Sequence, residues 1–256
     1  MHILITAGGT SEKIDEVRSI TNHSSGKLGV ALANAALAQQ TTIVDYIIAK
    51  GAVEPPGDPR IRLHRIENTA ELHETMAALL EKQAYDAVIH SMAVSDFTPQ
   101  VSSDQAAWLK AFNGWLKTRE TDELLSDEVF NELLLQIAKD APAQTKLSSQ
   151  TEHLLLVLKQ TPKVIAMIKE KQPETILVGF KLLVAVSETE LLKVAADNLA
   201  KNQADYVLAN DLTTITDGQH HGYLLNKNGV TGEADTKAAI AELILTTIAA
   251  DVRKKH

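Results

Sequence analysis

Short apolar runs and amphipathic segments alternate along the first third of the chain. The apolar runs are rich in β-branched side chains, which is typical of buried strands. The longer segments between them carry apolar side chains at helical spacing, as at Leu72, Met76 and Leu79. This alternation predicts a Rossmann-like α/β fold, in which a parallel sheet has helices on both faces. The predicted strands are residues 3–6, 42–48, 61–66 and 87–90, and the predicted helices are residues 27–39 and 69–83.

A long polar stretch then interrupts the alternation. Residues 99–150 are polar, mostly helical in pattern, and contain both tryptophans, Trp108 and Trp115. We expect an insertion or lid at about residues 100–145, within a single domain that spans residues 1–256. The pattern resumes with strands at residues 154–158, 176–180 and 206–209, helices at residues 161–171, 187–201 and 236–254, and a small hairpin at about residues 221–231.

The composition narrows the classes of protein to consider. The 256 residues are 45% hydrophobic and 23% charged, with a net charge of −8 and no cysteine. Basic residues are scattered, so we expect no general binding to nucleic acid. Without cysteine there is neither a disulfide nor a thiolate metal site. No secretory signal and no apolar run of about 18 residues occurs, so we expect a soluble cytoplasmic protein without a membrane segment.

Two glycine-containing turns near the N-terminus indicate a phosphate-binding site. The first predicted strand ends in Gly8, Gly9 and Thr10, and a second polar turn, residues 21–26, opens the first predicted helix. Glycine lets the backbone approach a ligand, and the N–H groups at a helix start favour negative charge. The turns therefore predict a phosphorylated ligand. Their spacing matches neither G-x-G-x-x-G nor G-x-x-x-x-G-K-[ST], so we expect a mode of binding that differs from these two motifs.

Polar clusters follow four of the predicted strands. In an open parallel sheet, ligands bind beyond the carboxyl ends of the strands, so we expect these clusters to converge on one edge. The alternative for any one cluster is an ordinary polar loop, but that explanation is weaker for all of them together. The clusters are residues 8–10, 91–96, 180–181 and 210–211.

Asn22 is the most informative single residue in the second turn. A primary amide can donate to a developing oxyanion without any proton transfer. Ser24 or Ser25 could simply cap the following helix, whatever the function. His23, between polar neighbours, is more often an exposed or structural residue than a catalytic base.

Asp96 and Lys146 each allow two interpretations. Asp96 is either a turn or cap residue, or an acceptor for the exocyclic amine of a nucleotide base. Lys146 is either a solvated surface charge or a phosphate clamp at the far end of the insertion.

Taken together, these segments resemble the phosphopantothenate–cysteine ligase family, in the monofunctional bacterial form found in streptococci. They occur in one order over nearly the whole chain, and the first and last are highly specific. The flavin-binding decarboxylase half of bifunctional relatives is lacking, so the resemblance implies no flavin. The matching stretches are residues 5–10, 14–15, 17–18, 21–26, 93–96, 146–149, 162–165, 179–180, 201–205 and 209–212.

The resemblance implies a two-step acid–amine ligation. The family activates the carboxylate of 4′-phosphopantothenate with CTP and Mg²⁺, which yields an acyl-cytidylate and pyrophosphate. The amine of cysteine then displaces CMP and forms 4′-phosphopantothenoylcysteine. The resemblance also implies a homodimer, with the hairpin or the insertion as the interface, and small molecules as the other partners.

The resemblance also assigns roles to residues. Asn22 would stabilise the oxyanion, Lys146 would stabilise the transferring phosphoryl group, and Asp96 would accept a hydrogen bond from the N4 amine of cytosine. The metal ligands remain unassigned, since phosphates and water commonly hold Mg²⁺. The implied nucleotide-binding residues are Gly8, Gly9, Thr10, Ala93, Asp96, Pro162, Lys163, Val164, Ile165, Phe180 and Lys201, and the implied substrate-binding residues are Ser24, Ser25, Gly26 and Asn210.

The chain departs from the family pattern in three places, and two rival functions stay open. The run after Lys146 is less basic than in bifunctional relatives, Asp197 stands where some relatives have a basic residue, and residues 99–145 are longer. One rival is a dinucleotide-dependent oxidoreductase, for which Asp45 lies in the second strand but the glycine fingerprint is missing. The other rival is a nucleotide-binding regulatory protein without turnover.

Overall fold

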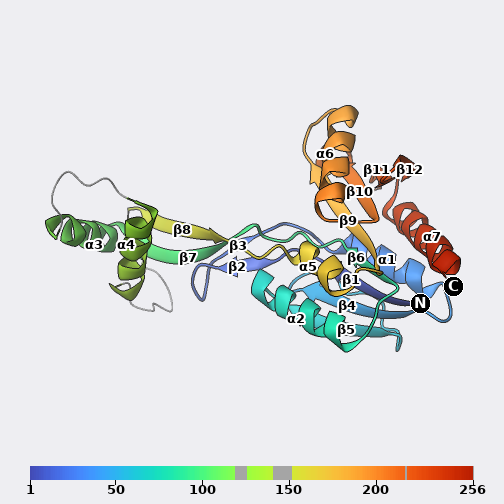
Figure 1. Cartoon of the computed structure of the whole chain (residues 1–256), viewed down its shortest axis with the longest axis horizontal. Helices are drawn as coiled ribbons and strands as arrows, with labels where there is room; N and C mark the ends of the chain where they lie inside the picture. Colours follow the sequence, from blue (N-terminus) through green and yellow to red (C-terminus); the bar gives the residue numbers. More distant parts are fainter. Residues whose placement is uncertain (119–125, 141–151, 217, 256) are drawn as a thin grey trace. The chain divides into compact units, whose positions relative to one another are not determined.

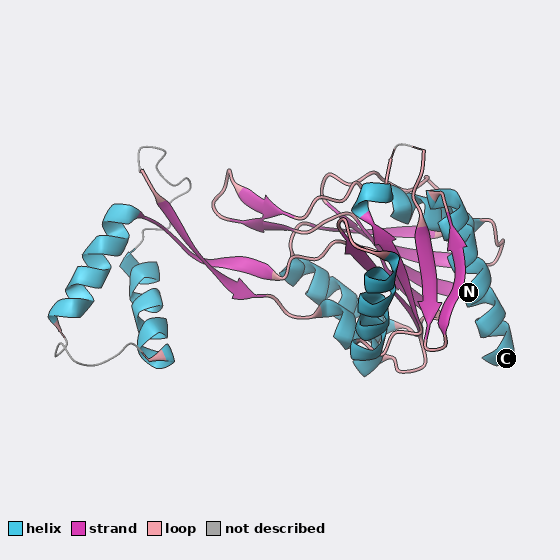
Figure 2. Ribbon diagram, turned by 90° about the horizontal axis from the view of Figure 1, so that it is seen from above, coloured by secondary structure: helices cyan, strands magenta, loops and turns pink. Residues whose placement is uncertain are grey.

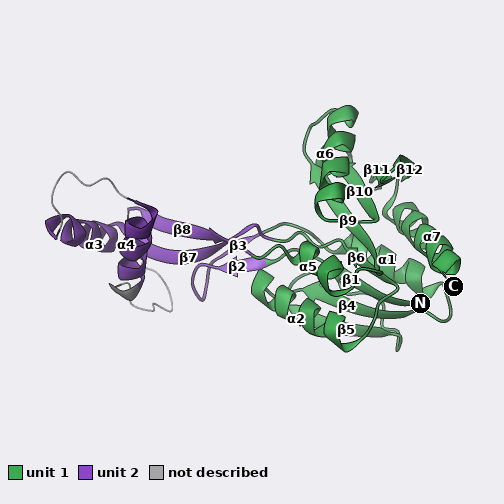
Figure 3. Ribbon diagram, viewed as in Figure 1, with its two compact units in different colours: residues 1–10, 22–94, 162–256 green, residues 11–21, 95–161 purple. Residues whose placement is uncertain are grey.

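The computed structural model describes the whole chain except residues 119–125, 141–151, 217 and 256. The chain divides into two compact units, which Figure 3 shows in different colours. The first unit comprises Met1–Thr10, Asn22–Val94 and Pro162–His256, and the second comprises Ser11–Thr21 and Ser95–Thr161. The expectation of one domain with an insertion stays a prediction.

The first unit is built on an eight-stranded sheet of order β12-β11-β10-β9-β6-β1-β4-β5 (Figures 1 and 2). The six strands from β10 to β5 are parallel, and β11 and β12 add an antiparallel hairpin. The predicted α/β class and the predicted hairpin are therefore confirmed. The strands are β1 (His2–Ala7), β4 (Ile43–Ala49), β5 (Ile61–Ile66), β6 (Ala87–His90), β9 (Ile176–Leu183), β10 (Tyr206–Asp211), β11 (Gly222–Asn226) and β12 (Gly229–Ala234).

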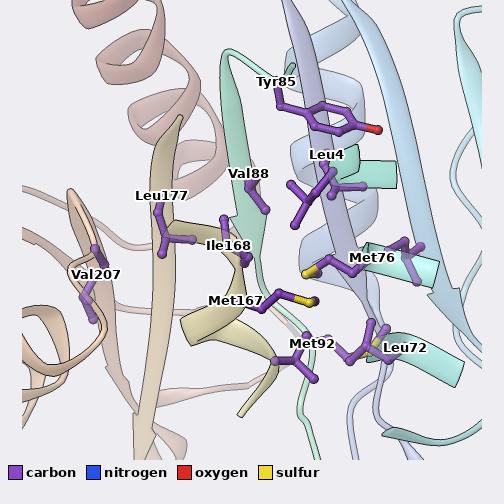
Figure 4. Packing of buried hydrophobic residues seen from close by; sticks show 14 of the residues in the cluster. Leu4, Leu72, Met76, Tyr85, Val88, Met92, Met167, Ile168, Leu177 and Val207 are labelled. Carbon is purple, nitrogen blue, oxygen red and sulfur yellow. The ribbon is translucent and has the colours of Figure 1, made fainter. Parts of the chain in front are cut away.

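Helices cover both faces of this sheet. On one face, α2 (Thr69–Lys82), α5 (Val164–Lys171) and α6 (Glu188–Lys201) pack against the strands. Figure 4 shows part of this core, where Met76 of α2 and Met167 of α5 lie over Leu4 and Val88. On the other face, α1 (Lys27–Leu37) and α7 (Lys237–Lys255) pack against the strands. Successive side chains of a strand point to opposite faces of the sheet, so neighbouring strand residues pack against different helices.

The second unit holds two antiparallel ribbons and two helices. Strands β2 (Ser11–Lys13) and β3 (Ser19–Thr21) pair with each other, as do β7 (Phe97–Asp104) and β8 (Leu154–Gln160). Helices α3 (Gln105–Lys117) and α4 (Asp127–Asp140) confirm the helical part of the insertion. They close a small core of Val101, Ala111, Leu133, Leu134 and Ile137.

Two expectations about this unit are wrong. Residues 154–158 form a strand, but β8 pairs antiparallel with β7 in its own ribbon rather than with the parallel sheet. Residues 99–104 are strand rather than helix. In that segment Val101 and Ser103 are buried on one side of the ribbon while their neighbours are more exposed, an alternation that its polar composition conceals.

Helix α5 also begins later than predicted. Its N-cap is Lys163 and its first residue is Val164, so Pro162 precedes the helix instead of occupying its first position. The reason lies in Thr161, whose backbone N donates to the Asp96 carbonyl at 3.0 Å and whose hydroxyl donates to the Ser95 carbonyl. These bonds hold the chain in an extended connection up to Thr161 itself.

Asp45 anchors the edge of the sheet at which the strands begin. Its carboxylate accepts hydrogen bonds from His2 and His64 at 2.9 and 2.8 Å, and from Gln83 and Tyr85 at 2.7 and 3.0 Å. Burial raises the pKa of Asp45, but these bonds outweigh it and hold the pKa well below the usual range. A dinucleotide-dependent oxidoreductase would need this carboxylate to bind the ribose of the dinucleotide. The Asp45 side chain is only 2% exposed, so it is not accessible to a ribose.

Tyr46, the next residue, contrasts with Tyr85 and provides a stability test. Its hydroxyl is buried beneath α1 without a hydrogen-bond partner among the described residues. We expect Tyr46→Phe to raise the free energy of unfolding by about 1 kcal/mol, because an unsatisfied polar group is removed. Tyr85→Phe is the matched control and should lower it by about 1–3 kcal/mol, since it removes a donor to Asp45. Urea denaturation measures both, and a destabilised Tyr46→Phe variant would contradict the expectation.

None of the helices in the described part of the chain combines the length and hydropathy needed to cross a bilayer.

Candidate functional site

The glycine turn after β1 is bonded to two neighbouring segments. Ala93 N donates to the Gly8 carbonyl at 2.9 Å, and Thr10 N donates to the Ala93 carbonyl at 3.0 Å. Asn22 N donates to the Thr10 carbonyl at 3.1 Å. A Cβ at Gly9 would lie only 1.8 Å from the carbonyl oxygen of Asn22, so this approach requires glycine. The structure thus brings together residues 8–10, Asn22 and Ala93, as the sequence predicts.

The start of α1 offers N–H groups to an anion. Gly26, with φ of 75°, is the N-cap residue, and no side chain caps the helix. The predicted serine cap is therefore wrong: the Ser25 hydroxyl reaches only the N–H of Lys27, at 3.4 Å. Ser24 and His23 are exposed. First-turn N–H groups without a cap, next to exposed hydroxyls, suit a phosphate group.

The methyl group of Ala52 packs closely against both glycine turns. A Cβ at Gly8, where φ is 93°, would lie 2.8 Å from the Ala52 methyl carbon, and one at Gly26 would lie 3.0 Å from it. Val53 N also donates to the Ser25 carbonyl at 3.0 Å. The loop after β4 therefore fixes the two turns against each other. A cavity of ≈ 330 Å³, lined in part by Ala52, lies at the carboxyl ends of β4 and β5.

A larger cavity lies elsewhere and does not mark this site. Its volume is ≈ 490 Å³, and Tyr85, Asp86, Gln172 and Thr175 are among its lining residues. These residues precede β6 and β9, so the cavity opens at the edge where the strands begin. In open parallel sheets the ligand edge is the opposite one.

A hydrogen-bonded network links the carboxyl ends of β1 and β6. The Thr6 hydroxyl lies 3.0 Å from Nδ1 of His90 and accepts from Met92 N at 3.2 Å. The Ser91 hydroxyl donates to the Thr6 carbonyl at 2.6 Å. Burial lowers the pKa of His90 to about 4, so the imidazole is neutral near pH 7. Ser91 lies in one of the polar clusters predicted from the sequence, whereas His90 and Thr6 are not among the predicted site residues. The sequence signal was a histidine at the end of an apolar strand, and its pairing with Thr6 follows only from the register of β1 and β6 in the structure.

Helices α5 and α6 meet over Gly179 of β9. A Cβ there would lie 3.3 Å from Ile165 Cδ1 and 4.0 Å from Asn198 Oδ1. Ile165 is in the first turn of α5, which has no side-chain cap. Lys201 is the exposed last residue of α6, one turn beyond Asn198. The predicted residues Lys163, Val164, Ile165 and Lys201 therefore share this face of the sheet.

Phe180 and Asn210 lie on the other face of the sheet. Phe180 packs against the core beneath α1 and α7. Asn210 Nδ2 lies 3.2 Å from Nε2 of His220, a buried residue whose Nδ1 has no partner among the described residues. Burial, together with the charge of Lys237, lowers the pKa of His220 to about 4. Phe180 is thus separated by the sheet from Val164 and Ile165, which are also predicted to contact the nucleotide.

Two predicted site residues fall outside the first unit. Asp96 belongs to the second unit, where its side chain is exposed and its carbonyl accepts from Thr161 N. Lys146 lies outside the described residues. Among the described residues no group of three or more histidine, aspartate or glutamate side chains is arranged to hold a metal ion.

These features define a class of protein. An open parallel sheet, with a glycine turn and helix starts without side-chain caps at one edge, is a Rossmann-like α/β architecture suited to anionic ligands. Residues 1–127 and 138–252 match the family described as the DNA/pantothenate metabolism flavoprotein C-terminal domain. The chain belongs to this family, so the resemblance drawn from its motifs is confirmed at that level.

Individual relatives agree with this assignment. The coenzyme A biosynthesis bifunctional protein CoaBC of Methanocaldococcus jannaschii is 31% identical over 248 residues, which cover 96% of this chain and 50% of that protein. CoaBC of Vibrio vulnificus is 30% identical over 256 residues, or 96% of this chain and 51% of that protein. The chain therefore spans about half the length of these relatives.

Solved structures extend the comparison to the fold. The DNA/pantothenate metabolism flavoprotein of Streptococcus pneumoniae is 40% identical, with a TM-score of 0.82 over 98% of this chain and 99% of that one. A complex of the Cab2 mutant H337A with phosphopantothenate-cysteine is 17% identical, with a TM-score of 0.67 over 99% of this chain and 86% of that one. At that identity the second likeness concerns the fold alone.

The two buried histidines make stability depend on pH. Both have a pKa near 4 in the folded protein and 6.5 as the ordinary value. Their contribution is complete above pH 6.5 and is lost as the pH falls toward 4. We expect the free energy of unfolding at pH 5 to be lower than at pH 8 by about 2 kcal/mol per histidine. Urea denaturation at both pH values measures this, and His220→Gln should remove about half of the difference. Equal stability at the two pH values would contradict it.

Proposed function

We propose that this protein is a phosphopantothenate–cysteine ligase, which joins a phosphorylated carboxylic acid to cysteine at the expense of a nucleoside triphosphate. The observation that carries the proposal is the bonding of Asn22 to the glycine turn beside the uncapped start of α1. This main-chain bonding holds residue 22 beside the glycine turn at the ligand edge of the sheet, and its side-chain amide is proposed to face the anion bound at the start of α1. Membership of the family supports the same activity.

The phosphorylated acid and the nucleotide are proposed to bind on opposite faces of the sheet. The phosphorylated acid is assigned to the α1 side, where Ser24, Ser25, Gly26 and Asn210 lie. The nucleotide is assigned to the start of α5, with Lys163, Val164, Ile165 and, further along, Lys201. Residues 8–10 and Ala93 lie between the two. The contact of Phe180 with the nucleotide stays a prediction.

Activation comes first in the proposed reaction. The substrate carboxylate attacks the α-phosphorus of the nucleotide, a P–O bond forms, and pyrophosphate leaves with the electron pair of the broken bond. Charge grows on the phosphoryl oxygens, and Lys146 is proposed to stabilise it. Mg²⁺ is proposed as the metal, held mostly by phosphates and water.

Amide formation follows. The cysteine amine attacks the carbonyl carbon of the acyl-nucleotide, and the carbonyl oxygen becomes negatively charged in the tetrahedral intermediate. The amide N–H of Asn22 is proposed to donate to that oxygen. Collapse of the intermediate breaks the C–O bond to the nucleoside monophosphate, which leaves with the electron pair, and loss of one amine proton to solvent gives the neutral amide.

The finer parts of the proposal concern the nucleotide and the assembly. CTP is proposed as the nucleotide because the carboxylate of Asp96 can accept from the N4 amine of cytosine, a donor that uracil lacks. A cytoplasmic homodimer that binds no nucleic acid, membrane or flavin completes the proposal.

One assay tests the proposed activity. Purified protein is incubated with Mg²⁺, 4′-phosphopantothenate, cysteine and either CTP or ATP, and release of pyrophosphate is followed. We expect release with CTP to require both other substrates at steady state, and to exceed release with ATP. Absence of pyrophosphate release with either nucleotide would favour the regulatory rival. Binding of NAD instead of CTP in a thermal-shift assay would favour the oxidoreductase.

Lys146 provides a test of the activation step. Lys146→Ala is expected to slow exchange of labelled pyrophosphate into CTP by about 100-fold, because a cation that stabilises growing phosphoryl charge is lost. Lys110→Ala, an exposed lysine on α3, is the control and should exchange at the wild-type rate. If Lys146→Ala also exchanges at the wild-type rate, the lysine has no part in activation.

A further inference from the structure

His90 is a buried histidine that the proposed reaction does not yet use. It is the last residue of β6, and its side chain shares the α2–α5–α6 face of the sheet with Val88, two residues before it. It keeps 7% of its surface exposed. It therefore stands at the ligand edge of the sheet, on the face assigned to the nucleotide.

The hydrogen bonds around Thr6 fix which nitrogen of His90 carries the proton. The Thr6 hydroxyl oxygen already accepts from Met92 N. If its own proton goes to Nδ1 of His90, both the N–H and the O–H are satisfied, and the ring proton must then be on Nε2. In the other tautomer the buried hydroxyl proton would have no acceptor among the described residues, which is costly. His90 is therefore assigned as the Nε2–H form.

Nε2 is left available by the protein. No described residue hydrogen-bonds to it. It is also not one of the enclosed polar atoms that lack a partner in the described part of the chain, whereas Nδ1 of His220 is. A polar N–H group that is mostly buried yet unpaired and not enclosed is suited to a ligand atom.

The register of the sheet places His90 beside the start of α5. Ile89 pairs with Val178, so one step further along His90 comes level with Gly179 on the neighbouring strand. Adjacent strands are about 4.8 Å apart. Gly179 has no side chain, and Ile165 from the first turn of α5 lies directly over it. The imidazole and the N–H groups of that first turn therefore approach the same space.

We propose that His90 donates a hydrogen bond through Nε2 to a phosphate oxygen of the nucleotide bound at the start of α5. This inference rests on the proposed function and adds a residue that contacts the nucleotide. Helix starts bind phosphate, and a neutral N–H donor fixed by Thr6 adds a directional bond there. Because Nε2 carries a proton, His90 acts as a donor and not as a general base.

The protonation behaviour of His90 supports this role. Its pKa of about 4 keeps the ring neutral near pH 7, so the Nε2–H donor is present at that pH. A neutral ring also adds no charge that would hold the product pyrophosphate in the site.

The direct test observes the imidazole nitrogens by NMR in wild-type protein with ¹⁵N-labelled histidine. We expect the Nε2–H tautomer at pH 7, and a shift of that resonance when CTP or pyrophosphate is added with Mg²⁺. Cytidine alone should leave it unmoved, which separates the phosphate group from the base as the source. If CTP binds and the resonance stays unchanged, the inference is overturned while the proposed function stands. If neither nucleotide nor pyrophosphate binds, both are overturned.

Variants give an independent readout. His90→Leu should weaken CTP binding or slow pyrophosphate exchange by about 10- to 100-fold, as for a lost hydrogen bond to a charged group. His90→Gln, whose amide can donate at a similar reach, should recover part of the loss. His64→Gln is the control, since His64 donates to Asp45 at the edge where the strands begin. Wild-type exchange by a folded His90→Leu protein would overturn the inference, and the NMR test holds even if that variant does not fold.

Discussion

Asn22→Ala is expected to leave formation of the acyl-nucleotide intact and to slow its aminolysis by cysteine by about 10²- to 10³-fold. The truncated side chain can no longer donate to the oxygen that becomes negative during attack. The backbone of residue 22 keeps its bond to Thr10, because that bond uses only main-chain atoms. Rapid quench of a single turnover measures both steps, and the acyl-nucleotide should accumulate.

The control for this variant is Asn34→Ala. Asn34 is exposed on α1, and its carbonyl accepts from Ala38 N through the main chain only. We expect wild-type kinetics for both steps. A wild-type second step in Asn22→Ala would remove Asn22 from the proposed mechanism, whereas a defect confined to activation would place Asn22 at the nucleotide instead.

Gly9→Ala is expected to lower activity in both steps by at least about 100-fold and to reduce the free energy of unfolding by about 3 kcal/mol. The new Cβ would lie 1.8 Å from the carbonyl oxygen of Asn22 and 2.9 Å from its carbonyl carbon. Both atoms are backbone, so the clash cannot be relieved by a side-chain rotation. The turn and Asn22 must separate, and the bond from Asn22 N to the Thr10 carbonyl is lost. Pyrophosphate exchange and thermal unfolding measure the two effects.

Gly57→Ala is the matched glycine control. No atom lies within 4 Å of a Cβ placed there, and its φ is not in the left-handed region. Its stability should change by less than about 0.5 kcal/mol, with full activity. If Gly9→Ala keeps wild-type turnover, the close approach of the two turns does not matter for the reaction.

The inner strands β1, β4, β6 and β10 were predictable from the sequence because they are buried on both faces, whereas the edge strand β5 was predictable from its alternating apolar residues. Residues 61–66 and 87–90 match β5 and β6 in both bounds, and the helix at residues 69–83 exceeds α2 by one residue. The ribbon of the second unit was not predictable in this way. Strand β7 is mostly polar, and its partner β8 reads as an apolar run that the parallel sheet could equally have accepted. The hydrophobic pattern of a short segment predicts that it forms a strand, but it does not predict which other strand pairs with it.

The candidate site shows the same limit at the level of single side chains. Motifs and the carboxyl-edge rule were enough to bring residues 8–10, Asn22 and Ala93 together. They could not tell that Phe180 and the start of α5 lie on opposite faces, since that depends on strand parity and on which helix covers which face. His90 was missed because its meaning depends on Thr6, 84 positions away in the sequence.

Ala52 illustrates how a residue with no proposed ligand contact restricts the sequences this fold can tolerate. Its methyl group packs against both Gly8 and Gly26 and leaves little room for a Cβ at either position. A bulkier residue at position 52 would push the two turns outward together, so natural variation there should be confined to glycine, alanine and serine. A homologue that carries valine or leucine at this position must hold both turns in a different conformation.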